Sequence, residues 1–159
     1  MPWTPGLSFS VGEIPTAAKL NSLVGNIDYA HDIASNSFTS GVNVTGTAFV
    51  DIVSAGAITY AATPIVVEFY AVRVAAGATD TMVLSLRDGA TDLGRVLALP
   101  ASQQSNPCYL AVKITPTAAS HTYVFSAKNL TAQTSTVYAG AGGADLNMPG
   151  YIRIRGIAS

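Results

Sequence analysis

The chain has 159 residues with a net charge of −1, and 49% of them are apolar while only 11% are charged. A chain this close to neutral lacks the excess of basic residues with which proteins bind nucleic acids or anionic membranes. No apolar run reaches the roughly 18 residues that are needed to span a bilayer. We therefore expect no nucleic-acid partner and no membrane insertion.

The charged fraction of 11% is less than half of the roughly 25% that is usual for a soluble domain. Either Ser, Thr and Asn replace the charges on solvated faces, or much of the surface is covered in an oligomer. We favour the oligomer. The single cysteine, Cys108, has no partner for an internal disulfide, so we expect it to be a small buried hydrophobe.

The first 13 residues are rich in residues that break regular structure, namely Pro2, Pro5, Gly6 and Gly12, and this composition predicts an extended arm. Trp3 is the only tryptophan in the chain. It either folds onto its own domain or anchors the arm in a pocket of another protein, as aromatic residues often do at interfaces.

A short helix is predicted from Ala17 to about Ala34, with Thr16 as its N-cap. Its apolar positions alternate spacings of three and four, which is the seam of a coiled coil. The seam consists of Ala17, Leu20, Val24, Ile27, His31 and Ala34. Such a helix either lies on its own β domain or forms a bundle with copies of itself, and we favour the bundle. A small polar linker is expected from Ser35 to Ser40.

The clearest strand runs from Ile65 to Val74, where β-branched and aromatic residues dominate and only Glu68 and Arg73 are charged. Both of its faces are largely apolar, so the strand belongs in the middle of a sheet or at a contact between subunits. A subunit contact would use Val66, Phe69, Tyr70 and Val72.

Further strands are predicted by short alternating runs between turns. They are residues 42–54 as one bent strand or two short ones, 57–61, a hairpin of 82–87 with 93–99, a hairpin of 108–114 with 121–126, 134–139, and 151–157. Strands without intervening helices indicate a mainly β fold, an antiparallel sandwich, jelly roll or barrel. We divide the chain into an arm and oligomerisation helix, 1–40, and a jelly-roll-like β-sandwich head, 41–159.

No recognisable catalytic setting surrounds either histidine, His31 or His121, and we expect no enzymatic activity. Asp28, His31 and Asp32 lie within one predicted helical turn, but no further strong ligand is near them. We therefore expect neither a metal nor a cofactor.

Two arginines, Arg153 and Arg155, fall on one face of the last predicted strand, opposite Ile152 and Ile154. Such a pair either binds an anion or, more often, is solvated or faces an acidic residue on a neighbouring strand.

The N-terminal segment carries a resemblance to a known group of proteins. Trp3-Thr4-Pro5-Gly6, followed by Gly12-Glu13-Ile14-Pro15-Thr16-Ala17-Ala18-Lys19-Leu20-Asn21, resembles the start of small virion proteins of tailed bacteriophages and prophages. In those proteins a tryptophan-containing arm precedes a Thr-Ala-Ala-x-Leu-Asn helix start. The remaining chain is similar to the trimeric jelly-roll heads, related to tumour-necrosis-factor and complement-like domains, that end phage fibres, spikes and decoration proteins.

The resemblance implies a non-enzymatic, homotrimeric surface component of the virion, in a tail fibre, tail tip, capsid decoration or head fibre, assembled in the host cytoplasm. Its arm would dock on other virion proteins of the capsid or tail through Trp3, Pro5 and Ile14. Leu20, Val24, Ile27 and His31 would form the seam between three chains. The alternative is a receptor- or glycan-binding adhesin head that uses the loops 77–81, 101–106 and 140–149. A third alternative is a hydrolase that depends on His31 or His121.

Overall fold

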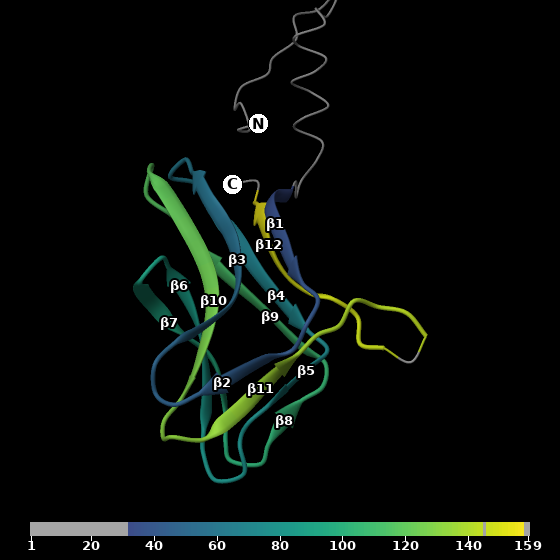
Figure 1. Cartoon of the computed structure of the whole chain (residues 1–159). Coiled ribbons are helices and arrows are strands. Elements are labelled where there is room, and N and C mark those ends of the chain that lie inside the picture. The colour runs from purple at the N-terminus through teal and green to yellow at the C-terminus, as the bar shows by residue number, and fades with distance from the viewer. Residues whose placement is uncertain (1–31, 145, 158–159) are drawn as a thin grey trace, which may run out of the picture.

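The computed structural model describes residues 32–144 and 146–157, which form two layers of strands (Figure 1). The predicted arm and the predicted helix up to His31 lie outside these residues.

Strands make up the regular secondary structure of the described part of the chain, and every pairing between them is antiparallel. Their bounds are β1 (Asp32–Phe38), β2 (Val42–Thr45), β3 (Val50–Thr59), β4 (Ile65–Ala71), β5 (Arg73–Ala75), β6 (Met82–Asp88), β7 (Thr91–Leu99), β8 (Gln104–Ser105), β9 (Cys108–Ile114), β10 (Ser120–Asn129), β11 (Thr134–Tyr138) and β12 (Gly150–Gly156). The prediction of a mainly β, antiparallel fold is confirmed.

Two four-stranded sheets form the layers. The first has the order β1-β12-β4-β9 and the second has the order β3-β10-β6-β7. A third, short sheet has the order β2-β11-β5-β8, and each of its strands directly follows or precedes the corresponding strand of the first sheet along the chain. The short sheet therefore continues the first sheet, and the whole is a jelly-roll-like β-sandwich.

The core lies between the first and second sheets. Val67 and Phe69 of β4 are fully buried, and so are Ile152 and Ile154 of β12, which lie directly opposite them in the register. From the second sheet Phe125 packs on Phe69, with ring centroids 4.9 Å apart. Successive side chains of a strand point to opposite faces of the sheet. Because Val67 and Phe69 point into the core, Glu68 and Tyr70 point to the outer face of the first sheet.

The prediction for the central strand is confirmed, with one refinement. β4 lies inside the first sheet, between β12 and β9. The predicted run 65–74 is interrupted at Val72, so that its end becomes the separate strand β5. Cys108 is buried, as expected for a small hydrophobe.

The predicted short α-helix is wrong where the structure describes it. No helix occurs in residues 32–144 or 146–157, and Asp32 to Ala34, the predicted last turn, begin the edge strand β1. The predicted linker 35–40 is also wrong, because its first four residues belong to the same strand. Pairing with β12 takes precedence over the local sequence here, since it satisfies the backbone groups of β1 along the sheet edge.

The predicted hairpin of 108–114 with 121–126 is wrong as well, whereas the hairpin of β6 with β7 is confirmed. β9 pairs with β4 in the first sheet, and β10 pairs with β3 and β6 in the second. Two strands that follow each other in sequence can belong to opposite layers of a sandwich. Strand periodicity gives the facing of side chains but not the choice of partner strand.

Gly150 is required where β1 meets β12. A Cβ atom at this position would overlap the ring of Phe38 and lie 2.8 Å from the carbonyl oxygen of Tyr70. Phe38 uses the free space to stack on Phe69, with ring centroids 6.2 Å apart. The missing side chain thus lets the edge strand close against the core.

Candidate functional site on the outer face of the first sheet

Cross-strand rows of side chains organise the outer face of the first sheet. Residues directly opposite one another in antiparallel strands point to the same side of the sheet. One row is Ser37, Tyr151, Tyr70 and Tyr109, and the next is Ser35, Arg153, Glu68 and Ala111. The outer face is therefore an aromatic row beside a charged row.

Glu68 is the centre of the charged row and is 1% exposed. Arg153 donates from Nε to Glu68 Oε2 at 2.7 Å, Tyr109 donates its hydroxyl to Oε1 at 2.8 Å, and Arg155 donates to the same Oε1. Both carboxylate oxygens are thus satisfied, as a buried carboxylate requires. We call these four residues the Glu68 cluster.

Opposing effects act on the pKa of the Glu68 carboxyl. Burial alone would raise its pKa, but hydrogen bonds from Arg153, Tyr109 and Arg155 together outweigh burial and hold the pKa below its usual value. The hydrogen bond to Glu68 raises the pKa of Tyr109 and also that of Arg153. The Glu68 carboxyl is therefore ionised at neutral pH, and the Tyr109 hydroxyl keeps the proton that it donates to Glu68.

Three tyrosines form the aromatic row. Tyr70 and Tyr151 stack with ring centroids 5.5 Å apart and an angle of 23° between their planes. Tyr109 lies on the edge strand β9 and is 51% exposed. An exposed aromatic surface of this kind suits contact with another protein or with the apolar face of a small ligand.

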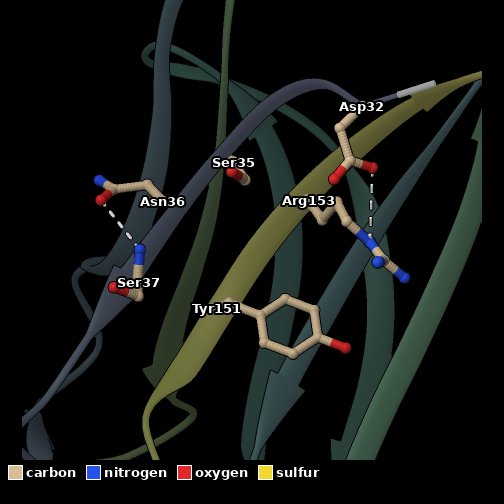
Figure 2. A pocket seen from close by; sticks show the side chains of 6 residues that line it. All are labelled: Asp32, Ser35, Asn36, Ser37, Tyr151 and Arg153. Atoms are coloured by element: carbon tan, nitrogen blue, oxygen red, sulfur yellow. Dashed lines mark hydrogen bonds and ion pairs between the residues drawn. The ribbon is translucent and has the colours of Figure 1, made fainter. Parts of the chain in front are cut away.

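A shallow hollow of about 440 Å³ lies over β1 and β12 at one end of these rows. Its lining residues are Asp32, Ser35, Asn36, Ser37, Tyr151 and Arg153. Figure 2 shows Asp32 and Arg153 facing each other, with the Tyr151 ring below them. The Asp32 Oδ1 and Arg153 Nε atoms are 3.9 Å apart. We call this feature the β1–β12 hollow.

A second polar cluster lies at an end of the second sheet. His121 Nδ1 is 2.6 Å from Asp88 Oδ2, and the backbone amide of Thr122 donates to Asp88 Oδ1 at 2.8 Å. His121 Nε2 lies 3.1 Å from Thr117 Oγ1 and 3.2 Å from the carbonyl oxygen of Thr117. We call Asp88, His121 and Thr117 the His121 cluster.

Carboxylate, imidazole and hydroxyl follow one another in the His121 cluster in the order of a nucleophilic triad. However, the nearby Thr117 carbonyl is an acceptor, which favours a proton on Nε2, and a protonated Nε2 cannot take the proton of the hydroxyl. The hydrogen bond to Asp88 raises the pKa of His121. Burial would raise the pKa of Asp88, but the hydrogen bonds from His121 and Thr122 lower it. The arrangement is that of an ion pair joining two chain segments.

Tyr60 and Tyr123 pack beside His121, with ring centroids 6.0 Å and 5.7 Å from it. Tyr60 is 4% exposed, and burial raises its pKa to about 12, with smaller contributions from Tyr123 and Asp88. The aromatic rings therefore remain neutral and shield one side of the ion pair from water.

The residues predicted for a subunit contact do not all share a face. Val66 and Tyr70 are half-buried and project from the outer face of the first sheet, whereas Phe69 is fully buried in the core. Val72 is half-buried between β4 and β5. The predicted docking and seam residues, Trp3, Pro5, Ile14, Leu20, Val24, Ile27 and His31, lie outside the described residues.

Two site residues, Tyr109 and Asp88, are not among those expected from the sequence. A signal for the Glu68 cluster was nevertheless present, because Arg153 and Arg155 on one strand face were expected to be solvated, to bind an anion or to meet an acidic residue, and Glu68 is that residue. No comparable signal existed for Asp88, which is 33 residues from His121 along the chain.

The loops predicted for receptor contact are small and polar, with one exception. In the segment between β11 and β12, which extends away from the sandwich in Figure 1, Leu146 is 63% and Met148 is 59% exposed. Backbone hydrogen bonds from Gly140 to Met148 and from Gly142 to Asn147 define its shape.

Within residues 32–144 and 146–157, no group of three or more His, Cys, Asp or Glu side chains has the arrangement of a metal site. In the same part of the chain, no helix has the length and apolar composition needed to cross a membrane.

Comparisons with known proteins concern the fold. No protein-family model matches the chain, and no curated protein matches it. Among solved structures, the mitogen derived from Yersinia pseudotuberculosis is 15% identical, with 79% of this chain and 86% of that chain covered and a TM-score of 0.32. The tumour-necrosis-factor protein Eiger from S. frugiperda is 14% identical, with 81% of this chain and 95% of that chain covered and a TM-score of 0.39.

Proposed function

We propose that this chain is a non-enzymatic structural protein of a tailed-phage virion, a homotrimeric surface component attached by its N-terminal arm. The observation that carries the proposal is the N-terminal segment, in which Trp3-Thr4-Pro5-Gly6 precedes the Thr16-Ala17-Ala18-Lys19-Leu20-Asn21 helix start. An anchor of this kind serves attachment to a larger particle.

The position of the first described strand supports an N-terminal attachment segment that is separate from the β-sandwich head. β1 begins at Asp32, directly after the last seam residue that precedes the sandwich, and it forms an edge of the first sheet. A seam at Leu20, Val24 and Ile27 would therefore gather three heads close to their sheet edges. Burial of one such side chain contributes about 1.5–3 kcal/mol, so three chains together can offset the cost of association.

The outer face of the first sheet supports a contact between heads. The Glu68 cluster pairs Glu68 with Arg153 and Arg155 within one subunit, so covering these three side chains leaves none of them without a partner. Beside them Val66 and Tyr70 are half-buried, and Tyr109 is 51% exposed. We assign the contact to the β4–β9 half of this face.

The test uses the full chain in the phage that encodes it. We expect purified particles to contain the wild-type protein, to lose it when Trp3 is replaced by Ala, and to show it at the particle surface when imaged. In solution the wild-type chain should sediment as a trimer, and the double variant Leu20→Asp, Ile27→Asp as a monomer or aggregate.

The control for the seam is Ser22→Asp, which adds one acidic side chain between seam positions and should remain trimeric. Particles that retain the Trp3→Ala protein at wild-type levels would argue against docking by the arm. Unchanged trimers of the double variant would argue against the helix seam.

A further inference from the structure

The β1–β12 hollow has the composition of a small-ligand site. Its volume of about 440 Å³ falls within the roughly 300–1,000 Å³ that such sites occupy. Asp32 supplies an acceptor, Arg153 supplies donors, and the Ser35 and Ser37 hydroxyls supply both. Tyr151 adds an aromatic ring. This mixture suits a ligand that carries several hydroxyl groups and one apolar face.

Contacts behind the hollow hold its walls in place. The Nε atom of Arg153 is held at 2.7 Å by the buried Glu68, and the Tyr151 ring stacks on Tyr70. On the other side, the Asn36 amide donates to the carbonyl oxygen of Ser54 at 2.8 Å. Because these walls are ordered before a ligand arrives, binding loses less conformational entropy.

The charges at the hollow sum to zero. Asp32 and Glu68 are acidic, Arg153 and Arg155 are basic, and the Glu68 cluster joins three of them. Asp32 is 53% exposed and lies 3.9 Å from Arg153, beyond hydrogen-bonding distance, so no side chain among residues 32–144 and 146–157 occupies its oxygens with a hydrogen bond. The absence of a net charge here favours a neutral ligand over an anion or a cation.

We propose that the β1–β12 hollow binds a neutral hexopyranose. The apolar face of the sugar ring packs on Tyr151, Asp32 accepts from sugar hydroxyls, and Arg153 donates to a hydroxyl oxygen. This binding site lies on the sheet face and not on the loops between strands, and it does not depend on docking of the arm to a particle. The hollow is shallow, so we expect a dissociation constant of about 1–10 mM for a single sugar unit.

The test is a titration of the isotope-labelled full chain with the methyl glycosides of glucose, galactose and mannose, followed by amide chemical shifts. We expect at least one of them to shift the amides of Ser35, Ser37 and Tyr151 in a saturable manner. Asp32→Ala should weaken the binding about tenfold, which corresponds to loss of a charge-assisted hydrogen bond. Tyr151→Leu, which keeps an apolar side chain but removes the ring, should abolish it.

Lys113→Ala is the matched control, because Lys113 is an exposed residue on β9, at the opposite edge of the same sheet. It should bind as the wild type does. Absence of saturable shifts with all three glycosides would overturn the proposal. Equal affinity of the Asp32→Ala variant would also overturn it, and so would binding of methyl glucuronide in preference to the neutral sugars. Dextran and a high-mannose glycopeptide, titrated separately, then distinguish a polysaccharide source from a glycoprotein source.

Discussion

Glu68 and Asp88 are acidic residues of the same domain that are each held by basic side chains, but they occupy different settings. Glu68 lies in the middle of a sheet and meets Arg153 and Arg155 across one strand boundary. Asp88 lies at the end of β6 and meets His121 near the start of β10. Both clusters join neighbouring strands of one sheet, but the first lies in the middle of its strands and the second lies where β6 ends beside the start of β10.

The two basic partners differ in their response to pH. Arginine stays charged throughout the physiological range, whereas histidine changes its charge within it. The Glu68 cluster is therefore a constant part of the first sheet, whereas the ion pair of the His121 cluster exists only while the imidazole is protonated. Similar carboxylate contacts can therefore stabilise a fold permanently in one place and conditionally in another.

Removal of the Glu68 carboxylate should have the largest effect. Glu68→Ala leaves two arginines on the sheet without their partner, and breaking a buried ion pair in this way costs about 3–5 kcal/mol. Both arginine side chains are about one-third exposed, at 35% and 34%, so we expect a loss at or below about 3 kcal/mol in the free energy of unfolding, measured with urea.

The control for this variant is Asp32→Ala, which removes a carboxylate near the same Arg153. Asp32 is 53% exposed, and such surface pairs contribute about 1 kcal/mol or less. Equal losses in the two variants would show that burial of Glu68 does not distinguish it from a surface carboxylate. The pKa of His121 should be unchanged in both, since its cluster belongs to the other sheet.

A smaller effect is expected from Gly150→Ala, which disturbs the first sheet where β12 pairs with the edge strand β1. The added methyl group overlaps the Phe38 ring and approaches the Tyr70 carbonyl oxygen, and overpacking of this kind costs about 1–3 kcal/mol. Relative to the wild type, amide hydrogen exchange should become faster in β1 and β12 by a larger factor than in β10. Gly41→Ala is the control, because its nearest neighbour would be 3.5 Å away, an ordinary contact. Equal destabilisation by both substitutions would contradict the close approach.

How far the sequence predicts this structure depends on the range of the interaction. Alternation of side chains identified β9 and β12 as strands with their facing, since it depends on residues two positions apart, whereas β4 was identified as a strand by its composition and its facing was not. The partner of β9 and the strand character of Asp32 to Ala34 could not be predicted, because both depend on pairing with strands distant in the sequence. The same holds for the site. The Arg153 and Arg155 face was visible in the sequence, whereas the contact of Asp88 with His121 depends on two segments that only the fold brings together.

The smallest expected effect is the pH dependence of the His121 cluster. Contact with Asp88 raises the pKa of His121 above its usual value of 6.5. A group with a raised pKa in the folded state contributes stability that is fully present below its unfolded pKa and is lost as the pH rises through the folded pKa. The pKa of Asp88 is lowered below 3.8, so its contribution is present above that value and is lost only in acid. The ion pair therefore stabilises the fold between these two folded-state pKa values.

The measurement compares the wild type with His121→Gln by urea unfolding from about pH 5 to about pH 9, across the range in which histidine titrates. We expect the wild type to be more stable at the acidic end and the difference to shrink as the imidazole loses its proton. The pH at which it shrinks should coincide with the His121 pKa measured from its ring protons, because one protonation event governs both. Asp88→Asn should lower that pKa, whereas Glu68→Gln should leave it in place. A stability difference that stays constant across this range would show that His121 acts by packing against Tyr60 and Tyr123 and not by its charge.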